Sequence, residues 1–241
     1  MPILEVEHLK KYFPVPNGLL HAVDDVSFSL EQGKTLGVVG ESGCGKSTLG
    51  KTILRLTDPT SGRVSFEGKD IAKMNAREFH QLRPNMQMIF QDPYASLDPR
   101  LTVRELIAEP MKIYKTQPDK ASLNRRIDEL METVSLAKRY ESSYPHELDG
   151  GRRQRVGIAR ALALNPKFVV CDEPVSSLDV SIQAQILNLL MDLQEKYGLT
   201  YLFITHDMSV VRHISDYICV MYLGQMIEKT DKRSLFEKPL H

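Results

Sequence analysis

Short segments of alternating apolar and polar residues occupy the first third of the chain. Residues 3–6 alternate in this way, and so do residues 26–30. Residues 63–66 form another such segment, bounded by turn-forming sequences at 58–62 and 67–69. Because a period of two places successive side chains on opposite faces, these segments predict an antiparallel sheet near the N-terminus.

From about residue 100 to residue 165, apolar residues recur at helical spacing instead. A later helix is indicated between residues 182 and 197, where an apolar stripe ends just before Gly198, a residue that can terminate a helix. Strands that alternate with helices predict an α/β fold with a mostly parallel sheet covered on both faces. The later strand segments that we expect are residues 168–171, 200–204, 218–222 and 225–228.

A glycine-rich loop follows the apolar run 36–39 and leads into a predicted helix at 49–54. Backbone N–H groups of such a loop, together with the start of the next helix, can surround a polyphosphate. Lys46 can then reach the β- and γ-phosphates, and the Ser47 hydroxyl can bind Mg²⁺. The strand–loop–helix context favours a nucleoside triphosphate site over a turn without a ligand. The loop reads Gly40-Glu41-Ser42-Gly43-Cys44-Gly45-Lys46-Ser47-Thr48.

Two acidic residues, Asp172 and Glu173, follow the buried-strand segment 168–171. The carboxyl ends of parallel strands form the edge at which α/β proteins bind ligands. We therefore expect Asp172 to hold Mg²⁺, partly through its water shell, and Glu173 to deprotonate the water that attacks the γ-phosphate. Two exposed acids at a strand end are the alternative, which the nearby phosphate loop disfavours.

The overall charge gives no support for a nucleic-acid partner. The 241 residues include 31 Lys and Arg and 31 Asp and Glu, so the formal net charge is zero. A neutral chain has no overall field that would attract nucleic acid. We therefore interpret the local arginine cluster as part of a loop and a helix surface. It comprises Arg152, Arg153, Arg155 and Arg160.

Composition and segment lengths indicate a cytoplasmic protein. The chain has 42% apolar and 26% charged residues, and no apolar stretch approaches the roughly 20 residues of a membrane helix. Its N-terminus lacks the layout of a secretion signal. The cysteines Cys44, Cys171 and Cys219 lack disulfide or zinc spacing and are expected to be buried thiols.

Together with further motifs, these sites make the sequence resemble the ATP-binding-cassette (ABC) ATPases over nearly its whole length. Residues 148–155 resemble the family's signature loop, Gln91 its Q-loop, Ser177-Leu178-Asp179 its D-loop and His206 its switch histidine. The resemblance implies one nucleotide-binding domain over residues 1–241. Its P-loop core with an antiparallel β subdomain would comprise residues 1–92 and 161–241, and residues 93–160 would form an inserted α-helical subdomain.

The resemblance also implies ATP and Mg²⁺ as ligands, and a head-to-tail pair in which each ATP lies between one phosphate loop and the partner's signature loop. Gln91 would contact Mg²⁺ with Ser47 and Asp172, and His206 would hydrogen-bond the γ-phosphate. Lys46, Gln91, Glu173 and His206 would form the catalytic set. Asp149, Gly150 and Gly151 would face the partner's ATP, Asp179 would lie at the dimer seam, and Phe13, or failing that Tyr12, would stack on adenine.

Within the family, residues 90–99, 159–167 and 174–185 look like the dipeptide/oligopeptide importer branch. That branch implies a peripheral subunit on the cytoplasmic membrane face, two permease subunits, a second ATPase and, indirectly, an external substrate-binding protein. It normally continues beyond the point corresponding to His241. Metal ions or oligosaccharides remain alternative cargoes. A soluble ABC ATPase acting on ribosomes or DNA is the alternative function, as is a subunit that binds ATP and scarcely hydrolyses it.

The signature loop departs from the family pattern at Asp149 and Arg152, where Ser and Gln are usual. Asp caps a helix as well as Ser does. However, a carboxylate at 4 Å from a phosphate charge would be repelled by about 4 kcal/mol at an effective dielectric constant of about 20. Arg152 could offset this repulsion in a working variant of the loop. We favour the other interpretation, an impaired loop in a pair with a second, non-identical ATPase.

Overall fold

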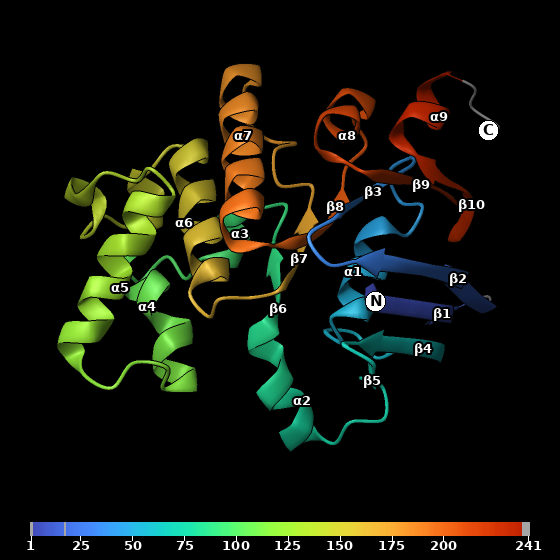
Figure 1. The fold of residues 1–241 in the computed structure, drawn as a ribbon, viewed down its shortest axis with the longest axis horizontal. Helices are drawn as coiled ribbons and strands as arrows, with labels where there is room; N and C mark the ends of the chain where they lie inside the picture. Colours follow the sequence, from blue (N-terminus) through green and yellow to red (C-terminus); the bar gives the residue numbers. More distant parts are fainter. Residues whose placement is uncertain (1, 17, 238–241) are drawn as a thin grey trace.

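The computed structural model describes residues 2–16 and 18–237 (Figure 1). Met1, Asn17 and residues 238–241 lie outside this description, and with them the extreme ends of the predicted domain. The described chain forms an antiparallel sheet, a mostly parallel sheet and a group of helices. None of the helices in these ranges has both the length and the apolar character that crossing a membrane requires.

The predicted antiparallel sheet near the N-terminus is present. It has the strand order β2-β1-β4-β5, and every pairing within it is antiparallel. Buried and exposed residues alternate along the end of β2, as the period of two predicts. The buried face of this sheet packs on α1 (Lys46–Ile53) and one face of the other sheet. The strands are β1 Pro2–Val15, β2 Gly18–Glu31, β4 Ser61–Phe66 and β5 Lys69–Asp70.

The mostly parallel sheet has the order β10-β9-β3-β8-β7-β6, with only the β9–β10 pair antiparallel. β3, β7 and β8 are buried along their whole length, as expected for strands covered on both faces. β6 is an addition to the predicted strands: its half-buried Gln87 interrupts a short apolar run. The strands are β3 Thr35–Val39, β6 Met86–Ile89, β7 Phe168–Asp172, β8 Thr200–Ile204, β9 Tyr217–Tyr222 and β10 Gln225–Asp231.

Side-chain caps and a left-handed glycine fix several helix ends. Thr102 and Glu105 form a reciprocal capping box at the start of α4 (Val103–Tyr114). Gly198, with φ of 64°, ends α7 (Val180–Tyr197), as predicted. The other helices are α2 Ala76–Leu82, α3 Pro93–Ser96, α5 Lys120–Thr133, α6 Gly150–Leu162, α8 Met208–Ile214 and α9 Lys232–Glu237.

The helices α3 to α6 lie between β6 and β7 in the chain and gather beside the edge of the parallel sheet that β6 forms (Figure 1). Their apolar residues join α7 and one face of that sheet in a common hydrophobic cluster. The predicted boundary at residue 160 falls within α6. The division into residues 1–92, 93–160 and 161–241 stays a prediction.

Candidate functional site

The phosphate loop connects β3 to α1, as its sequence predicts. Gly45 has φ of 104°, and a Cβ atom there would lie 1.9 Å from the carbonyl oxygen of Ala22. A Cβ atom at Gly40 would lie 2.2 Å from the carbonyl oxygen of Met221. These approaches exclude any larger residue at either position without a shift of the backbone. The loop is therefore closely packed against β2 and β9.

Lys46 is buried within the phosphate loop. Its Nζ donates hydrogen bonds to the carbonyl oxygens of Gly40 and Glu41, each at 2.8 Å. Only 5% of the residue is exposed. Because a buried ammonium group needs oxygen partners, the loop carbonyls hold its charge at the place where phosphate oxygens are expected to bind.

Ser47 and Asp172 meet beneath this loop. The Ser47 hydroxyl donates to Asp172 Oδ1 at 2.7 Å, and Asp172 is only 4% exposed. Burial raises the pKa of the Asp172 carboxyl, and the hydrogen bond from Ser47 opposes that rise. A buried carboxylate beside a hydroxyl is the hard oxygen donor set that suits Mg²⁺, and a cation there would compensate the burial of the negative charge.

Gln91, Glu173 and His206 also come together. Gln91 Nε2 donates to Glu173 Oε2 at 2.9 Å, and His206 Nδ1 lies 3.4 Å from the same oxygen. The three residues follow β6, β7 and β8, which are neighbours in the parallel sheet. Their meeting therefore follows from the order of the strands, whose carboxyl ends share one edge. Their roles in hydrolysis stay predictions.

A pocket of about 420 Å³ lies over the phosphate loop. Phe13 lines it, whereas Tyr12 stacks on His21 with ring centroids 3.9 Å apart and donates a hydrogen bond to Asp24. This hydrogen bond raises the pKa of Tyr12 to about 12 and lowers that of Asp24. Of the two candidate aromatic residues, Phe13 is thus the one in the pocket.

The remaining lining residues come from the loop and from four other parts of the chain. Gln91 and Glu173 were predicted site residues. The start of β2 and the turn between β9 and β10 were not predicted to contribute to the site, because these segments carry no sequence motif. The lining residues beyond Phe13 are Leu20, His21, Ala22, Ser42, Gly43, Cys44, Gly45, Lys46, Ser47, Thr48, Gln91, Glu173, Leu223 and Gly224.

Residues 23–176, more than half of the chain, match a family model described as ABC transporter. The chain belongs to that family. It is 53% identical to the oligopeptide transport ATP-binding protein AppF of Bacillus subtilis (strain 168), over 99% of this chain and 75% of AppF. It is 49% identical to the glutathione import ATP-binding protein GsiA of Escherichia coli O157:H7, over 100% of this chain and 40% of GsiA.

Solved structures agree with this assignment. The dimeric structure of the ATP-binding cassette MJ0796 in a post-hydrolysis state, bound to ADP and Pi, has a TM-score of 0.86 and 28% sequence identity, and the match covers 95% of this chain and 99% of that chain. CbiO1 from Clostridium perfringens, part of the ABC transporter complex cbiONQ, has a TM-score of 0.86 and 27% identity, over 98% of this chain and 91% of that chain. The predicted fold and the predicted ATPase activity are confirmed.

Two side chains of the signature loop of this ABC ATPase, Asp149 and Arg152, form an ion pair with each other. Asp149 caps α6, since its Oδ1 accepts a hydrogen bond from the Arg152 N–H at 2.7 Å. Its Oδ2 lies 2.7 Å from Arg152 Nη1, and the Arg152 guanidinium lies 4.6 Å from the centroid of the Tyr140 ring. Both members of this ion pair are about half exposed. The carboxylate is thus neutralised locally.

The predicted signature loop and D-loop lie apart from the pocket over the phosphate loop of their own chain. In the described part of the chain, the residues that line this pocket include neither the start of α6 nor Asp179, which precedes α7. Gly150 and Gly151 pack against Leu178 and Ile182 instead. One chain therefore does not bring these predicted nucleotide contacts, including Asp149, to its own phosphate loop.

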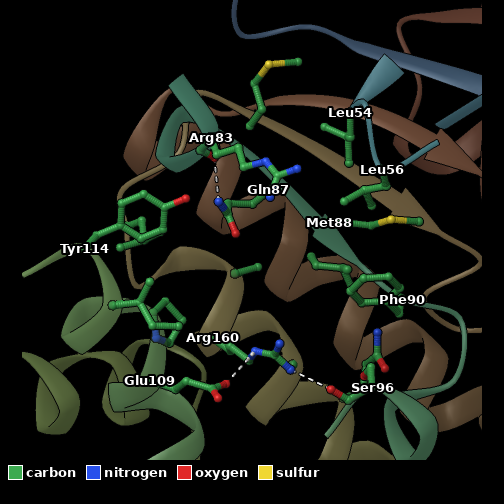
Figure 2. A pocket seen from close by; sticks show the side chains of 18 residues that line it. Leu54, Leu56, Arg83, Gln87, Met88, Phe90, Ser96, Glu109, Tyr114 and Arg160 are labelled. Atoms are coloured by element: carbon green, nitrogen blue, oxygen red, sulfur yellow. Dashed lines mark hydrogen bonds and ion pairs between the residues drawn. The ribbon is translucent and has the colours of Figure 1, made fainter. Parts of the chain in front are cut away.

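A groove of about 270 Å³ lies between β6, at the edge of the parallel sheet, and the inserted helices (Figure 2). Its walls come from β6, the C-terminal half of α4 and one face of α6. Leu56, Phe90 and Ile113 bring exposed apolar side chains to it. β6 lies in the wall of this groove and its chain continues into Gln91, so one strand leads from the groove to the hydrogen bond between Gln91 and Glu173.

Arg160 lies between this groove and the pair formed by Ser47 and Asp172. Its Nη1 donates to the carbonyl oxygen of Ser96 at 2.6 Å, and its Nε lies 4.0 Å from Glu109 (Figure 2). Arg160 and Ser96 also line a second hollow, which reaches Ser47 and Asp172. This arginine is half-buried and holds a backbone carbonyl, so it is more than the helix-surface residue that the sequence suggested.

Proposed function

We propose that this chain is the ATP-hydrolysing subunit of a membrane importer for dipeptides or oligopeptides. The observation that carries the proposal is the course of β6, which runs from the wall of an apolar groove to Gln91, the hydrogen-bond partner of Glu173. A partner in the groove would therefore act on a strand that leads directly to the catalytic residues. The names of the relatives, which transport oligopeptides or import glutathione, support peptides as the cargo.

In the proposed reaction, ATP occupies the pocket over the phosphate loop, with its base against Phe13. The ammonium group of Lys46 exchanges loop carbonyls for phosphate oxygens. Ser47, Asp172 and Gln91 would hold Mg²⁺, which neutralises phosphate charge when bound. Their hydroxyl, carboxylate and amide oxygens are suitable donors.

Glu173 then accepts a proton from the attacking water. Its Oε2 receives a hydrogen bond from Gln91 and lies within reach of His206, so both neighbours must release this oxygen or share it with the water. Released from Glu173, His206 would hydrogen-bond the γ-phosphate. The resting contacts therefore keep the base occupied until nucleotide and partner rearrange the site.

We further propose that the chain works in an asymmetric, head-to-tail pair with a second ATPase. Its own nucleotide pocket includes no residue of its signature loop among the described residues, so a partner would supply that part of each site. The Asp149–Arg152 pair offers the partner's ATP neither a free hydroxyl nor an unpaired cation. The second subunit would therefore contribute the working signature loop, and Asp179 would lie at the seam.

The groove between β6, α4 and α6 is the proposed docking site for the permease, which would comprise two transmembrane subunits, on the cytoplasmic face of the membrane. Its exposed apolar residues and its walls of helix and strand suit a short helix of the permease. An external binding protein would act indirectly, by delivering peptide to the permeases. The chain itself would be a peripheral subunit.

A pull-down tests this function. Tagged Glu173→Gln protein, which should hold ATP without turnover, is bound in native membrane extracts with Mg-ATP, and its partners are identified by mass spectrometry. We expect two multi-span permeases and a second, non-identical ATPase, and fewer of each without nucleotide. Recovery of ribosomes, of DNA-repair proteins or of the chain alone would overturn the proposed function.

A further inference from the structure

The turn between β9 and β10 borders the pocket over the phosphate loop. Tyr222 pairs with Gln225, so Leu223 and Gly224 alone connect the two strands. Both have positive φ, 46° at Leu223 and 83° at Gly224. A two-residue hairpin turn with two positive φ values prefers Asn or Asp followed by Gly. Leu223 therefore occupies a backbone conformation that a bulky apolar residue rarely adopts.

A second two-residue turn shows how such a position is used elsewhere in the chain. Glu67 and Gly68, between β4 and β5, have φ of 49° and 75°. The Glu67 carboxylate forms an ion pair with Lys167. Leu223, by contrast, is 71% exposed, and none of the apolar clusters formed by the described residues includes it. Packing within the described chain therefore does not account for a leucine in this unfavourable conformation.

Backbone hydrogen bonds hold this turn against the phosphate loop and β2. The Gly224 N–H donates to the Cys44 carbonyl oxygen at 2.9 Å, and the Gly224 carbonyl oxygen accepts from the Asp24 N–H at 2.8 Å. A Cβ atom at Gly224 would lie 2.6 Å from the carbonyl oxygen of His21. Because Gly224 is fixed on both sides, its neighbour Leu223 is held at the pocket that it lines.

Leu223 belongs to the apolar part of the pocket lining. Phe13 and Leu20 are partners across β1 and β2 and line the same pocket, and Leu20 is 56% exposed. Lys46 and Ser47 line the pocket as well and supply the phosphate-binding groups. The flat faces of a nucleotide base gain from apolar contacts, whereas the phosphates need the N–H groups of the loop and the charge of Lys46. The exposed leucines therefore suit the base.

We propose that Leu223 packs against the base of the bound nucleotide and, with Leu20, completes the apolar subsite to which Phe13 belongs. The proposal rests on the ATP position proposed above, with the base against Phe13, and adds a residue that no sequence motif marks. Contact with the base would compensate the unfavourable conformation of Leu223 when nucleotide is bound. Leu223 then contributes to nucleotide affinity and takes no part in the hydrolytic step.

The test variant is Leu223→Asn, which removes the apolar side chain and introduces a residue that favours this turn. We expect the melting temperature of the free chain to rise by about 2 °C, because the unfavourable backbone conformation is relieved. We expect the affinity for ADP to fall by about fivefold, because the apolar contact with the base is lost.

The matched control is Ser135→Asn, which introduces the same residue at another exposed position of positive φ. Ser135 has φ of 53° and follows α5, and it is not among the residues that line the pocket. This variant should gain stability in the same way and bind ADP as the parent protein does. Phe13→Ala is the reference for the base position and should weaken ADP binding.

The assay is isothermal titration calorimetry of the full chain with Mg²⁺, using ADP and inorganic tripolyphosphate as ligands, beside thermal melts of the free chain. ADP carries the base and is not hydrolysed, whereas tripolyphosphate binds through phosphate groups alone. Since Leu223→Asn keeps the backbone bonds of Gly224, its affinity for tripolyphosphate should equal that of the parent.

Weaker binding of ADP by Leu223→Asn, with unchanged binding of tripolyphosphate, supports the inference. Equal weakening of both ligands would overturn it, because the effect would then lie in the phosphate loop. Unchanged ADP binding by Leu223→Asn while Phe13→Ala binds weakly would overturn the inference and leave the proposed ATP position intact. Unchanged ADP binding by both variants would overturn the inference and that position together.

Discussion

The ion pair between Asp149 and Arg152 makes a specific prediction about nucleotide-driven association. Arg152→Gln removes the cation that lies 2.7 Å from Asp149 Oδ2 and leaves the carboxylate at the start of α6 unpaired. Asp149→Asn does the reverse, because it removes the negative charge and keeps a side chain that caps a helix well. The two variants therefore change the charge facing a partner's ATP in opposite directions.

The magnitude follows from the distance between charges. A carboxylate 4 Å from a phosphate charge, at an effective dielectric constant of about 20, is repelled by about 4 kcal/mol, which corresponds to roughly a thousandfold change in affinity. This is an upper limit, because Asp149 and Arg152 are 49% and 41% exposed in the free chain and solvent screens them. For the same reason, we expect little change in the melting temperature of the free Arg152→Gln protein.

The assay is ATP-dependent self-association in a Glu173→Gln background, measured by analytical ultracentrifugation with Mg-ATP. We expect Asp149→Asn to associate most tightly, the parent weakly and Arg152→Gln least. Asp149→Ser should also permit or strengthen association. Arg153→Gln is the matched control: it loses the same charge one position away, where the guanidinium lies over the Tyr94 ring instead.

Equal association of Arg152→Gln and Arg153→Gln would refute the idea that Arg152 shields the Asp149 carboxylate. Tight ATP-driven association of the parent protein would refute the impaired signature loop and the asymmetric pair with it. In that case the Asp149–Arg152 exchange would be a working variant of the loop.

Three further predictions concern the phosphate-loop site and an ion pair between two of the inserted helices. Glu173→Gln should retain ATP binding in a fluorescent-nucleotide titration and lose turnover, and unchanged turnover would remove Glu173 from the role of base. Gly45→Ala should abolish ATP binding in the same titration, because the new Cβ atom would lie 1.9 Å from the Ala22 carbonyl oxygen. The hydrogen bond from Arg104 lowers the pKa of Asp128, so this pair stabilises the folded chain fully above the ordinary aspartate pKa, and the stabilisation is lost as pH falls through the lowered pKa. In thermal melts, the stability difference between pH 3 and pH 6 should therefore be smaller for Arg104→Gln than for the parent protein. An identical pH dependence of the two proteins would contradict this.

The phosphate loop shows what sequence can predict. Its glycines, Lys46 and Ser47 are contiguous, and the strand and helix that flank it follow from local pattern. The proximity of Gln91, Glu173 and His206 cannot be read from local sequence pattern in the same way. It depends on the order β8-β7-β6, which local pattern does not reveal, and β6 was not predicted because Gln87 breaks its short apolar run.

The choice between Tyr12 and Phe13 shows a second limit. Neighbouring residues of a strand point to opposite faces, so only one of the two can face the nucleotide. The pairing of β1 with β2 has register shifts on both sides of Lys11, and such an irregularity changes which face each later residue occupies. Sequence can therefore name the pair of candidates, whereas the register decides between them.

The attachment of the inserted helices to the sheet has a mechanical consequence. The chain leaves the sheet at the carboxyl end of β6 and returns at the amino end of β7, and these strands are parallel neighbours with β6 at the sheet's edge. The two attachment points therefore lie at opposite ends of the edge, separated by about the length of a four-residue strand, about 13 Å. A line through them runs along the strands, so a rotation of the inserted helices about that line would stretch the chain at neither attachment, but it would rearrange the apolar cluster that joins these helices to α7 and the sheet. The start of α6 would then swing through an arc while Gln91, beside the pivot, hardly moves.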